Sequence, residues 1–356
     1  MATASDLPAL AVRGRALVRR DTGAPVRLRG VNRSGLEYAA PIAAGPEAVL
    51  ASVRFDQADL DRIAGWGARV IRIPFTQDFV FRGRGPASGA DYVAALDQVI
   101  AWAEARGLYT LLDLQWLDGD TPHGVGQDGS INRVPPLPIP ETVDLWRLLA
   151  LRYRDRPSVL FDLFNEPHTP MTGDDMPLVG VLPDGGFWPL PARMVGMDEW
   201  QPWALRLIDA IRDVHPEALI FVSGVNWAFD LRGFPLLDRA GRPRDGIVYS
   251  THVYPWCRAG FPAPPERYWT RAFGRLARDW PVFAGEFGGG EADLEWGRTL
   301  LAYLEAWTVG WTAWSWCDWP PLLRDHRGGD CDPSGFGAIV RAGLAGSRQP
   351  GDPAAA

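Results

Sequence analysis

Two glutamates in this chain stand where a pair of carboxyl groups could carry out acid–base and nucleophilic chemistry. Glu166 ends the apolar run LFDLFNEP, and Glu286 ends the apolar run PVFAGEFGG. A lone charge at the end of a buried run is costly, so two such positions point to a site. Two carboxyls that flank a glycosidic bond can cleave it, one protonating the departing oxygen while the other attacks the anomeric carbon or activates water. A structural ion pair is the alternative that these residues alone leave open.

The neighbouring polar residues suit such a pair. Arg72, within VIRIPF, could lower the pKa of Glu286 by proximity, and Tyr254, after IVYSTHV, could hydrogen-bond to Glu286 and hold it ionised. Asn165 could hold the 2-hydroxyl of the sugar, and Trp314 could stack under the same ring. A nucleophilic role for one glutamate requires the two carboxyls to lie roughly 5–5.5 Å apart.

The elements that must position these residues are short apolar runs that alternate with helical patterns. The expected strands are Val26–Val31, Arg69–Phe75, Tyr109–Leu114, Val159–Phe164, Leu219–Ser223, Ile247–Thr251, Val282–Ala284 and Trp311–Ser315. The expected helices are Asp59–Trp66, Asp91–Arg106, Pro140–Tyr153, Asp198–Val214, Pro265–Arg278, Asp293–Val309 and Phe336–Leu344.

This alternation predicts an α/β fold with parallel strands, and eight nearly continuous apolar strands favour a closed (β/α)₈ barrel of the TIM type. An open doubly wound sheet is the alternative, although GVNRSG after the first strand does not match the G-x-G-x-x-G phosphate turn. We expect one catalytic domain over residues 1–356, with its core at about 26–345 and short flexible termini.

Two long segments, Leu117–Pro140 and Pro167–Met197, follow strands at the end where a barrel places its active site. Loops of this length are typical of functional segments, and we expect them to form a substrate cleft. Glu37 and Tyr38 follow the first strand and could line this cleft. Candidate aromatic platforms for sugar rings are Trp188, Trp227, Trp256 and Trp319.

The segments IRIPF, FDLFNEPH, VYSTHVY, PVFAGEFGG and AWSW together resemble glycoside hydrolase family 5, the cellulase family of retaining barrel enzymes with catalytic glutamates on strands four and seven. The resemblance runs from about Val26 to about Gly337. It implies that Glu166 is the acid/base and Glu286 the nucleophile. It also implies a surrounding shell of Arg72, Asn165, His252, Tyr254 and Trp314.

One position departs from the family's pattern. Where the family usually ends its third strand with Asp-x-His, this chain has Asp113-Leu114-Gln115. Glutamine can donate and accept hydrogen bonds but cannot be protonated. We expect Gln115 to keep a substrate-binding role, with the identity of the sugar left open.

Composition excludes several other classes of protein. The net charge is −7 and no basic stripe is present, which argues against a nucleic-acid partner. No apolar stretch has the length of a membrane span, and the start MATASDLPAL lacks the pattern of a signal peptide, so the compartment stays open. No Cys/His cluster suggests zinc, and we expect no metal, no cofactor and a monomer. Cys317 and Cys331 could pair or stay free, and the acidic stretch of Asp318, Asp325, Asp330 and Asp332 fits a solvated loop better than a calcium site.

The first functional hypothesis is an endo-acting β-1,4-glucanase with retention of configuration. Related hydrolases of β-mannan, xyloglucan, short oligosaccharides or a glycolipid are alternatives. A non-catalytic carbohydrate-binding barrel is a third reading, against which the presence of both carboxyls argues.

Overall fold

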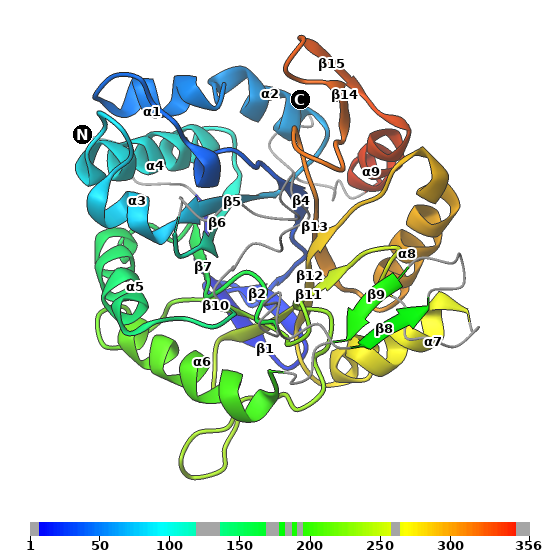
Figure 1. The fold of residues 1–356 in the computed structure, drawn as a ribbon. Coiled ribbons are helices and arrows are strands. Elements are labelled where there is room, and N and C mark those ends of the chain that lie inside the picture. Colours follow the sequence, from blue (N-terminus) through cyan, green and yellow to red (C-terminus); the bar gives the residue numbers. More distant parts are fainter. Residues whose placement is uncertain are drawn as a thin grey trace.

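A computed structural model describes residues 7–118, 136–168, 195–257 and 264–346, together with the backbone of 178–181 and 187–190. Eight parallel strands close into a barrel, which confirms the expected (β/α)₈ architecture (Figure 1). In chain order the barrel strands are β4 (Arg29–Asn32), β5 (Val70–Thr76), β6 (Tyr109–Trp116), β7 (Val159–Asp162), β10 (Ile220–Ser223), β11 (Ile247–Val253), β12 (Val282–Phe287) and β13 (Gly310–Ala313).

Helices surround the barrel on its outside (Figure 1). They are α1 (Pro46–Ser52), α2 (Gln57–Gly65), α3 (Gln77–Arg82), α4 (Gly89–Glu104), α5 (Pro140–Tyr153), α6 (Met197–Arg212), α7 (Pro265–Trp269), α8 (Leu294–Ala306) and α9 (Gly335–Ala345). Between β10 and β11, turns and isolated bridges stand in place of a helix. No helix of the described residues is long and apolar enough to cross a membrane.

Most of the expected elements are present with small shifts at their ends. The helix expected over Pro265–Arg278 is an exception, because α7 ends at Trp269 and continues as a π-helical turn over Thr270–Gly274 and a 3₁₀ turn over Leu276–Arg278. Two antiparallel hairpins, β8–β9 (Leu178–Val181 and Phe187–Leu190) and β14–β15 (Leu323–Asp325 and Asp330–Pro333), lie outside the barrel sheet. Most of the two long loops falls outside the described residues.

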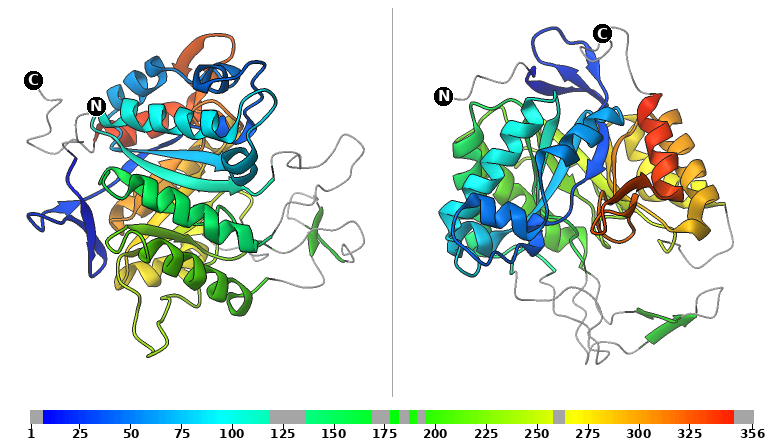
Figure 2. Two further views of the ribbon diagram at one scale, coloured as in Figure 1. Left: turned by 90° about the vertical axis from the view of Figure 1, so that its left-hand side faces the viewer. Right: turned by 90° about the horizontal axis from the view of Figure 1, so that it is seen from above.

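A three-stranded antiparallel sheet that the sequence reading missed covers one end of the barrel. Its strands are β1 (Leu10–Arg13), β2 (Ala16–Arg19) and β3 (Pro25–Val26). Leu10 packs into an apolar cluster with residues from the beginnings of the barrel strands, among them Leu28, Val70 and Tyr109. Figure 2 shows this sheet in blue, projecting from one end of the barrel. The amino-terminal end of the barrel is therefore closed, and the carboxyl ends of the strands carry the polar residues described next.

Buried tryptophans tie the outer helices to the carboxyl ends of the strands. Trp146 on α5 donates its indole N–H to the carbonyl of Leu163 at 2.9 Å, and Trp200 on α6 donates to the carbonyl of Ser223 at 2.8 Å. Both rings are fully buried. A buried indole N–H requires a partner, so these bonds fix the position of each helix along the neighbouring strand. The chain has 17 tryptophans, and these two thus serve the fold.

Candidate active site

Glu166 and Glu286 converge at the carboxyl-terminal mouth of the barrel. Glu166 lies just beyond β7, the fourth barrel strand, and Glu286 lies in β12, the seventh. A carboxylate oxygen from each glutamate and Nδ1 of His252 all lie within 4.8 Å of one another. So close an approach of two carboxylate oxygens fits the roughly 5–5.5 Å separation of a retaining pair better than the roughly 6.5–9.5 Å that leaves room for an attacking water.

Glu286 is held from two sides by hydrogen-bond donors. Arg72 Nη1 donates to its Oε1 at 2.8 Å, and the Tyr254 hydroxyl donates to its Oε2 at 2.8 Å. Burial raises the pKa of Glu286, whereas Arg72 and the Tyr254 hydrogen bond lower it, and the net direction is upward. The expectation that Arg72 opposes protonation of Glu286 therefore holds for its own contribution, but burial outweighs it.

Glu166 has a different set of partners. Its Oε1 lies 2.8 Å from Nδ1 of His252, and its side chain is 17% exposed, against 5% for Glu286. Burial raises the pKa of Glu166 well above its ordinary value, and the nearby charge of Glu286 adds to the rise. Burial, followed by the charge of Arg72, lowers the pKa of His252 well below its ordinary value, so the imidazole is neutral. The pair is thus asymmetric, because Glu166 favours the protonated form more strongly than Glu286 does.

A β-bulge sets the position of His252. The pairing of β11 with β12 shifts register between Thr251 and His252, which places His252 opposite Glu286. Gly285 supports this arrangement, since a Cβ there would lie 2.5 Å from the Ser250 hydroxyl and 2.9 Å from Nε2 of His252. A larger residue at 285 would push the imidazole away from Glu166.

Arg72 occupies the centre of the buried polar layer. Its guanidinium lies 2.9 Å from Asp113 Oδ1, 2.9 Å from Asp162 Oδ2 and 2.8 Å from Glu286 Oε1. Burial disfavours its charge, but the three carboxyls raise its pKa overall. Arg72 also donates to the side-chain oxygens of Asn32, at 3.0 Å, and of Asn165, at 2.9 Å.

Sequence reasoning missed Asn32, Asp113 and Asp162 as parts of this layer. Each is fully buried in a barrel strand. A signal was present, because Asp113 precedes Gln115 by two positions and Asp162 precedes Glu166 by four. Side chains at even spacing along a strand face the same side, so Asp113 faces the barrel interior with Gln115, and Asp162, at the end of β7, contacts Arg72 there as well.

The structure brings Asn165, Gln115 and Trp314 to the same mouth. Asn165 is 2% exposed, and its Nδ2 has no hydrogen-bond partner among the described residues. Gln115 is 6% exposed with its Oε1 likewise unpaired in that part of the chain, and both residues line a small hollow next to Glu166. Trp314 donates its indole N–H to the carbonyl of Trp319 at 2.9 Å and is 7% exposed.

The two residues after the first barrel strand have different environments. Glu37 is 1% exposed and accepts hydrogen bonds from the Ser34 hydroxyl, at 2.5 Å, and the Gly35 N–H, at 2.6 Å. Burial raises its pKa to about 7 despite these bonds. Glu37 therefore anchors its own loop from the inside, whereas Tyr38 is 44% exposed and can face a ligand.

Three aromatic rings form a parallel stack beside Glu286. The Trp256 ring lies 4.6 Å from the Tyr254 ring and 5.8 Å from the Trp319 ring, with interplanar angles of 9° and 14°. Trp256 therefore lies nearly parallel to both rings and is 40% exposed, while Trp319 is 70% exposed. Of the other candidate platforms, Trp227 stacks on His168 at 4.0 Å, and the side chain of Trp188 lies outside the described residues.

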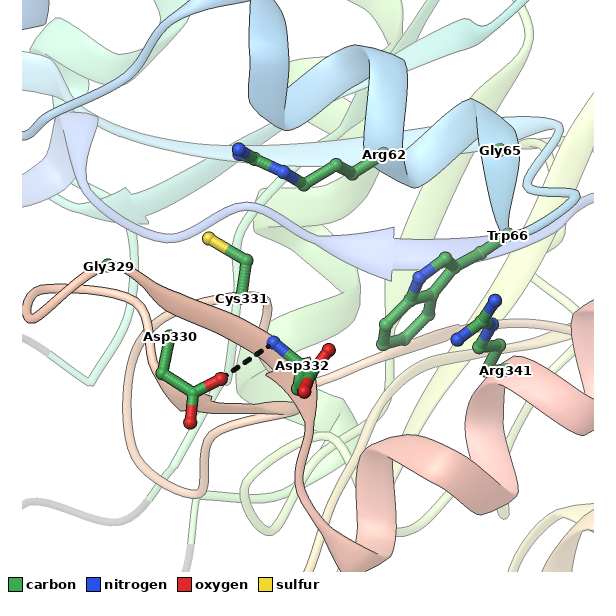
Figure 3. Close-up of a pocket in the computed structure, with 8 residues that line it drawn as sticks. All are labelled: Arg62, Gly65, Trp66, Gly329, Asp330, Cys331, Asp332 and Arg341. Atoms are coloured by element: carbon green, nitrogen blue, oxygen red, sulfur yellow. Dashed lines mark hydrogen bonds between the residues drawn. The ribbon is translucent and has the colours of Figure 1, made fainter.

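A hollow of about 540 Å³ lies elsewhere, between α2, the β14–β15 hairpin and α9 (Figure 3). Its aromatic residue, Trp66, is 8% exposed and carries the Arg341 guanidinium 5.9 Å from its ring centroid. It contains neither glutamate of the pair. We therefore place the candidate active site at the barrel mouth, where the carboxyls converge, although this other hollow is larger.

Among the described residues, one group has the composition and spacing to hold a metal ion, namely Glu166, His252 and Glu286. The same atoms take part in the hydrogen bonds described above. The three cysteines are free thiols. The acidic residues after β13 have separate partners, since Asp332 pairs with Arg324 at 2.8 Å and Asp318 contacts the Ser34 hydroxyl at 3.2 Å.

The fold and the paired carboxyls at its mouth define the chain as a (β/α)₈ barrel of the glycosidase kind. The model of the cellulase family, glycosyl hydrolase family 5, matches residues 20–319, and the chain belongs to that family.

Two relatives are an endoglucanase of Paenibacillus polymyxa, 27% identical over 72% of this chain, and the major extracellular endoglucanase of Xanthomonas campestris pv. campestris, 28% identical over 86%. The chain spans 68% and 65% of the lengths of these two proteins. Among solved structures, the β-glucanase SdGluc5_26A of Saccharophagus degradans matches with a TM-score of 0.71 and 24% identity, over 96% of this chain and 94% of that one. At that identity the match shows the shared fold.

Proposed function

We propose that this protein is an endo-β-1,4-glucanase that cleaves its substrate by double displacement, with Glu286 as the nucleophile and Glu166 as the acid/base. The observation that carries the proposal is the approach of the two carboxyls to within 4.8 Å, combined with their unequal partners. Such spacing fits a retaining mechanism. We also propose that the described elements form one catalytic domain.

In the first step, Glu286 attacks the anomeric carbon as a carboxylate, and Glu166 transfers its proton to the departing glycosidic oxygen. The C–O bond to the leaving sugar breaks, and an ester forms between the sugar and Glu286. In the second step, Glu166 takes a proton from a water molecule, whose oxygen attacks the same carbon and displaces Glu286. The two inversions together retain the configuration.

The electrostatics of the pair support the exchange of roles by Glu166. In the free site the charge of Glu286 helps to raise the pKa of Glu166, so Glu166 carries a proton that it can give. Once Glu286 has become an ester, that charge is gone, and the pKa of Glu166 falls. Glu166 then accepts a proton from water, as the second step requires.

The surrounding residues have complementary tasks in this proposal. The unpaired Nδ2 of Asn165 is available to donate to the sugar's 2-hydroxyl, and Trp314 provides an apolar floor for the ring. The substrate class is supported by the relatives, which are endoglucanases, and by SdGluc5_26A, whose structure was solved with cellotetraose. A β-linked glucan is therefore the substrate that we propose.

The test is to trap the covalent intermediate with a 2-fluoro cellobioside and to locate the adduct by mass spectrometry. We expect it on Glu286, and an adduct on another residue would overturn the assignment. Glu286→Gln should abolish both labelling and turnover. Glu104→Gln is a control, since the side chain of Glu104 is 8% exposed and pairs with Arg156 on the outside of the barrel.

Substrate choice is tested separately, by following the viscosity of carboxymethyl cellulose, mixed-linkage β-glucan and mannan. A rapid loss of viscosity with the glucans and none with mannan is expected. Cleavage of mannan alone would replace the substrate while leaving the mechanism intact. The absence of turnover on every glycan, together with the absence of labelling, would refute catalysis.

A further inference from the structure

Two buried aspartates lie side by side beneath the candidate catalytic pair. Asp113 on β6 and Asp162 on β7 are direct partners in the register of these parallel strands. Both are fully buried, and both face the guanidinium of Arg72, from Nη2 at 2.9 Å and from Nε at 2.9 Å respectively.

The hydrogen bonds of the two carboxyls are incomplete and unequal. Asp162 Oδ2 accepts a bond from Arg72 Nε, but its Oδ1 has no partner among the described residues. In the same part of the chain, neither oxygen of Asp113 has a donor with hydrogen-bond geometry, although Arg72 lies close to it. A buried carboxylate without donors is strongly disfavoured relative to a neutral carboxylic acid, which itself needs an acceptor.

The charges around Arg72 also favour a bound proton at one of the carboxyls. Arg72 carries one positive charge and contacts three carboxyls, those of Asp113, Asp162 and Glu286. Three buried anions around one cation would leave a net charge of the kind that proteins remove by binding a proton. Glu286 has a second donor in Tyr254, and Asp162 has the Arg72 Nε bond, so Asp113 is the member least able to remain ionised.

We propose that Asp113 and Asp162 share a single proton, held between Asp113 and the unpaired Oδ1 of Asp162, and that this dyad acts as a positioning element for Arg72 and Glu286. The dyad then carries one negative charge. This charge partly neutralises Arg72, so that Arg72 stabilises the Glu286 carboxylate less strongly than it would alone. The two aspartates touch no substrate in this proposal. They set how strongly Arg72 holds Glu286 ionised.

Other charged groups around Asp113 agree with this assignment. Besides Arg72 on β5 and Asp162 on β7, Asp113 faces Glu286 on β12 and Glu37 in the turn after β4, and all three carboxyls favour its neutral form. Burial contributes first to the raised pKa of Asp113, and burial also raises the pKa of Asp162, against the effect of Arg72. Arg72 is the one cation among these neighbours.

Infrared difference spectroscopy tests the shared proton directly and does not depend on the proposed function. A neutral carboxylic acid has a carbonyl stretch separate from the carboxylate bands, and labelling of aspartate at its carboxyl carbon distinguishes it from Glu166 and Glu37. At pH 7 we expect wild-type protein to have one such aspartate band. Asp113→Asn and Asp162→Asn should each abolish it, because the remaining aspartate ionises beside Arg72. The double variant should lose no more than either single one.

Other outcomes would overturn the dyad. If both aspartates are ionised, wild type and variants all lack the band. If both are neutral, each single variant loses half of it and the double variant loses all. Asp59→Asn is the control, since Asp59 is a buried aspartate whose pKa is lowered to about 2 and which should contribute no band. Near-ultraviolet circular dichroism reports folding, and should the double variant not fold, the single variants still decide.

The pH–rate profile tests the positioning role and rests on the proposed function. Each single variant keeps one charge in the dyad, so its acidic limb should move by less than about 0.3 pH unit. The double variant removes that charge. Arg72 then lowers the pKa of Glu286 more strongly, and the acidic limb should move about one pH unit lower. Equal, additive shifts from the two single variants would refute the shared charge. A failure of the proposed function would remove the profile but leave the infrared result standing.

Discussion

The hydroxyl of Tyr254 offers the sharpest test of how the proposed nucleophile is kept ionised. Tyr254→Phe removes a donor that lies 2.8 Å from Glu286 Oε2 and leaves the ring, so the stack on Trp256 can persist. Among the described residues, Glu286 would keep one close donor, Arg72 Nη1 at 2.8 Å. His252 Nδ1 lies 3.7 Å away, too far to replace the lost bond.

The expected magnitude follows from the type of bond. A hydrogen bond to a charged group contributes about 1.5–3 kcal/mol, and one pKa unit corresponds to about 1.4 kcal/mol. Since the hydroxyl donates to the ionised form, its loss raises the pKa of Glu286, by about one to two units. The acidic limb of kcat/KM should move to higher pH by that amount. The plateau should fall by about tenfold, because Glu286 is then oriented by Arg72 alone.

The assay is kcat/KM on a soluble aryl β-cellobioside across the pH range, with Tyr249→Phe as the control. Tyr249 lies in β11, the strand that Tyr254 directly follows, is also buried, and uses its hydroxyl to accept a hydrogen bond from the backbone N–H of Leu236 at 3.1 Å. Its loss should affect stability and leave the acidic limb in place. A Tyr254→Phe limb at the wild-type position, or one moved to lower pH, would refute the reasoning about Glu286.

Three further outcomes are expected. Asp59→Asn should lower the free energy of unfolding at pH 7 by about 2 kcal/mol, because burial alone would raise the pKa of Asp59 but His326 and Arg33 lower it from 3.8 to about 2. In urea titrations, this difference from wild type should shrink as the pH falls from about 4 towards about 2, where wild-type Asp59 is itself protonated; a difference that stays constant with pH would contradict it. Trp319→Ala should raise KM on β-glucan about fivefold with little change in kcat, since an exposed ring at the end of a stack contributes binding rather than chemistry; an unchanged KM would remove Trp319 from the cleft. Gln115→Ala should lower kcat/KM about tenfold if its unpaired amide oxygen meets a sugar hydroxyl, and unaltered kinetics would exclude Gln115 from substrate binding.

Much of the site could be predicted because the carboxyl ends of all strands in a parallel barrel meet at the same mouth. Glu286 and Arg72 lie in two different strands, Glu166 and Tyr254 follow two others, and the structure brings the four side chains together. The sequence could not predict the net shift in the pKa of Glu286, which burial raises and the neighbouring donors lower. The outcome for Glu286 depends on how deeply it is buried, and burial is a property of the whole barrel.

Other features depended on loop conformation or on weak local signals. Trp256 was a candidate platform, but the sequence does not reveal that its ring lies nearly parallel to those of Tyr254 and Trp319. The amino-terminal sheet was missed because its strands have four residues or fewer. Its turn was visible in principle, since Gly14, at a φ of 58°, separates the short runs LAVR and ALVR.

The closed end of the barrel also decides how the molecule can be tethered. The described chain begins beside the β1–β3 sheet, and α9 finishes near the turn before β5, where a Cβ on Gly67 would lie 2.9 Å from the carbonyl of Leu344. Both attachment points therefore lie on the side of the molecule away from the mouth (Figure 2). A solid support or an added protein module joined at either point would leave the glutamate pair facing outward, so immobilised enzyme should remain accessible to a polymeric chain as long as cellulose.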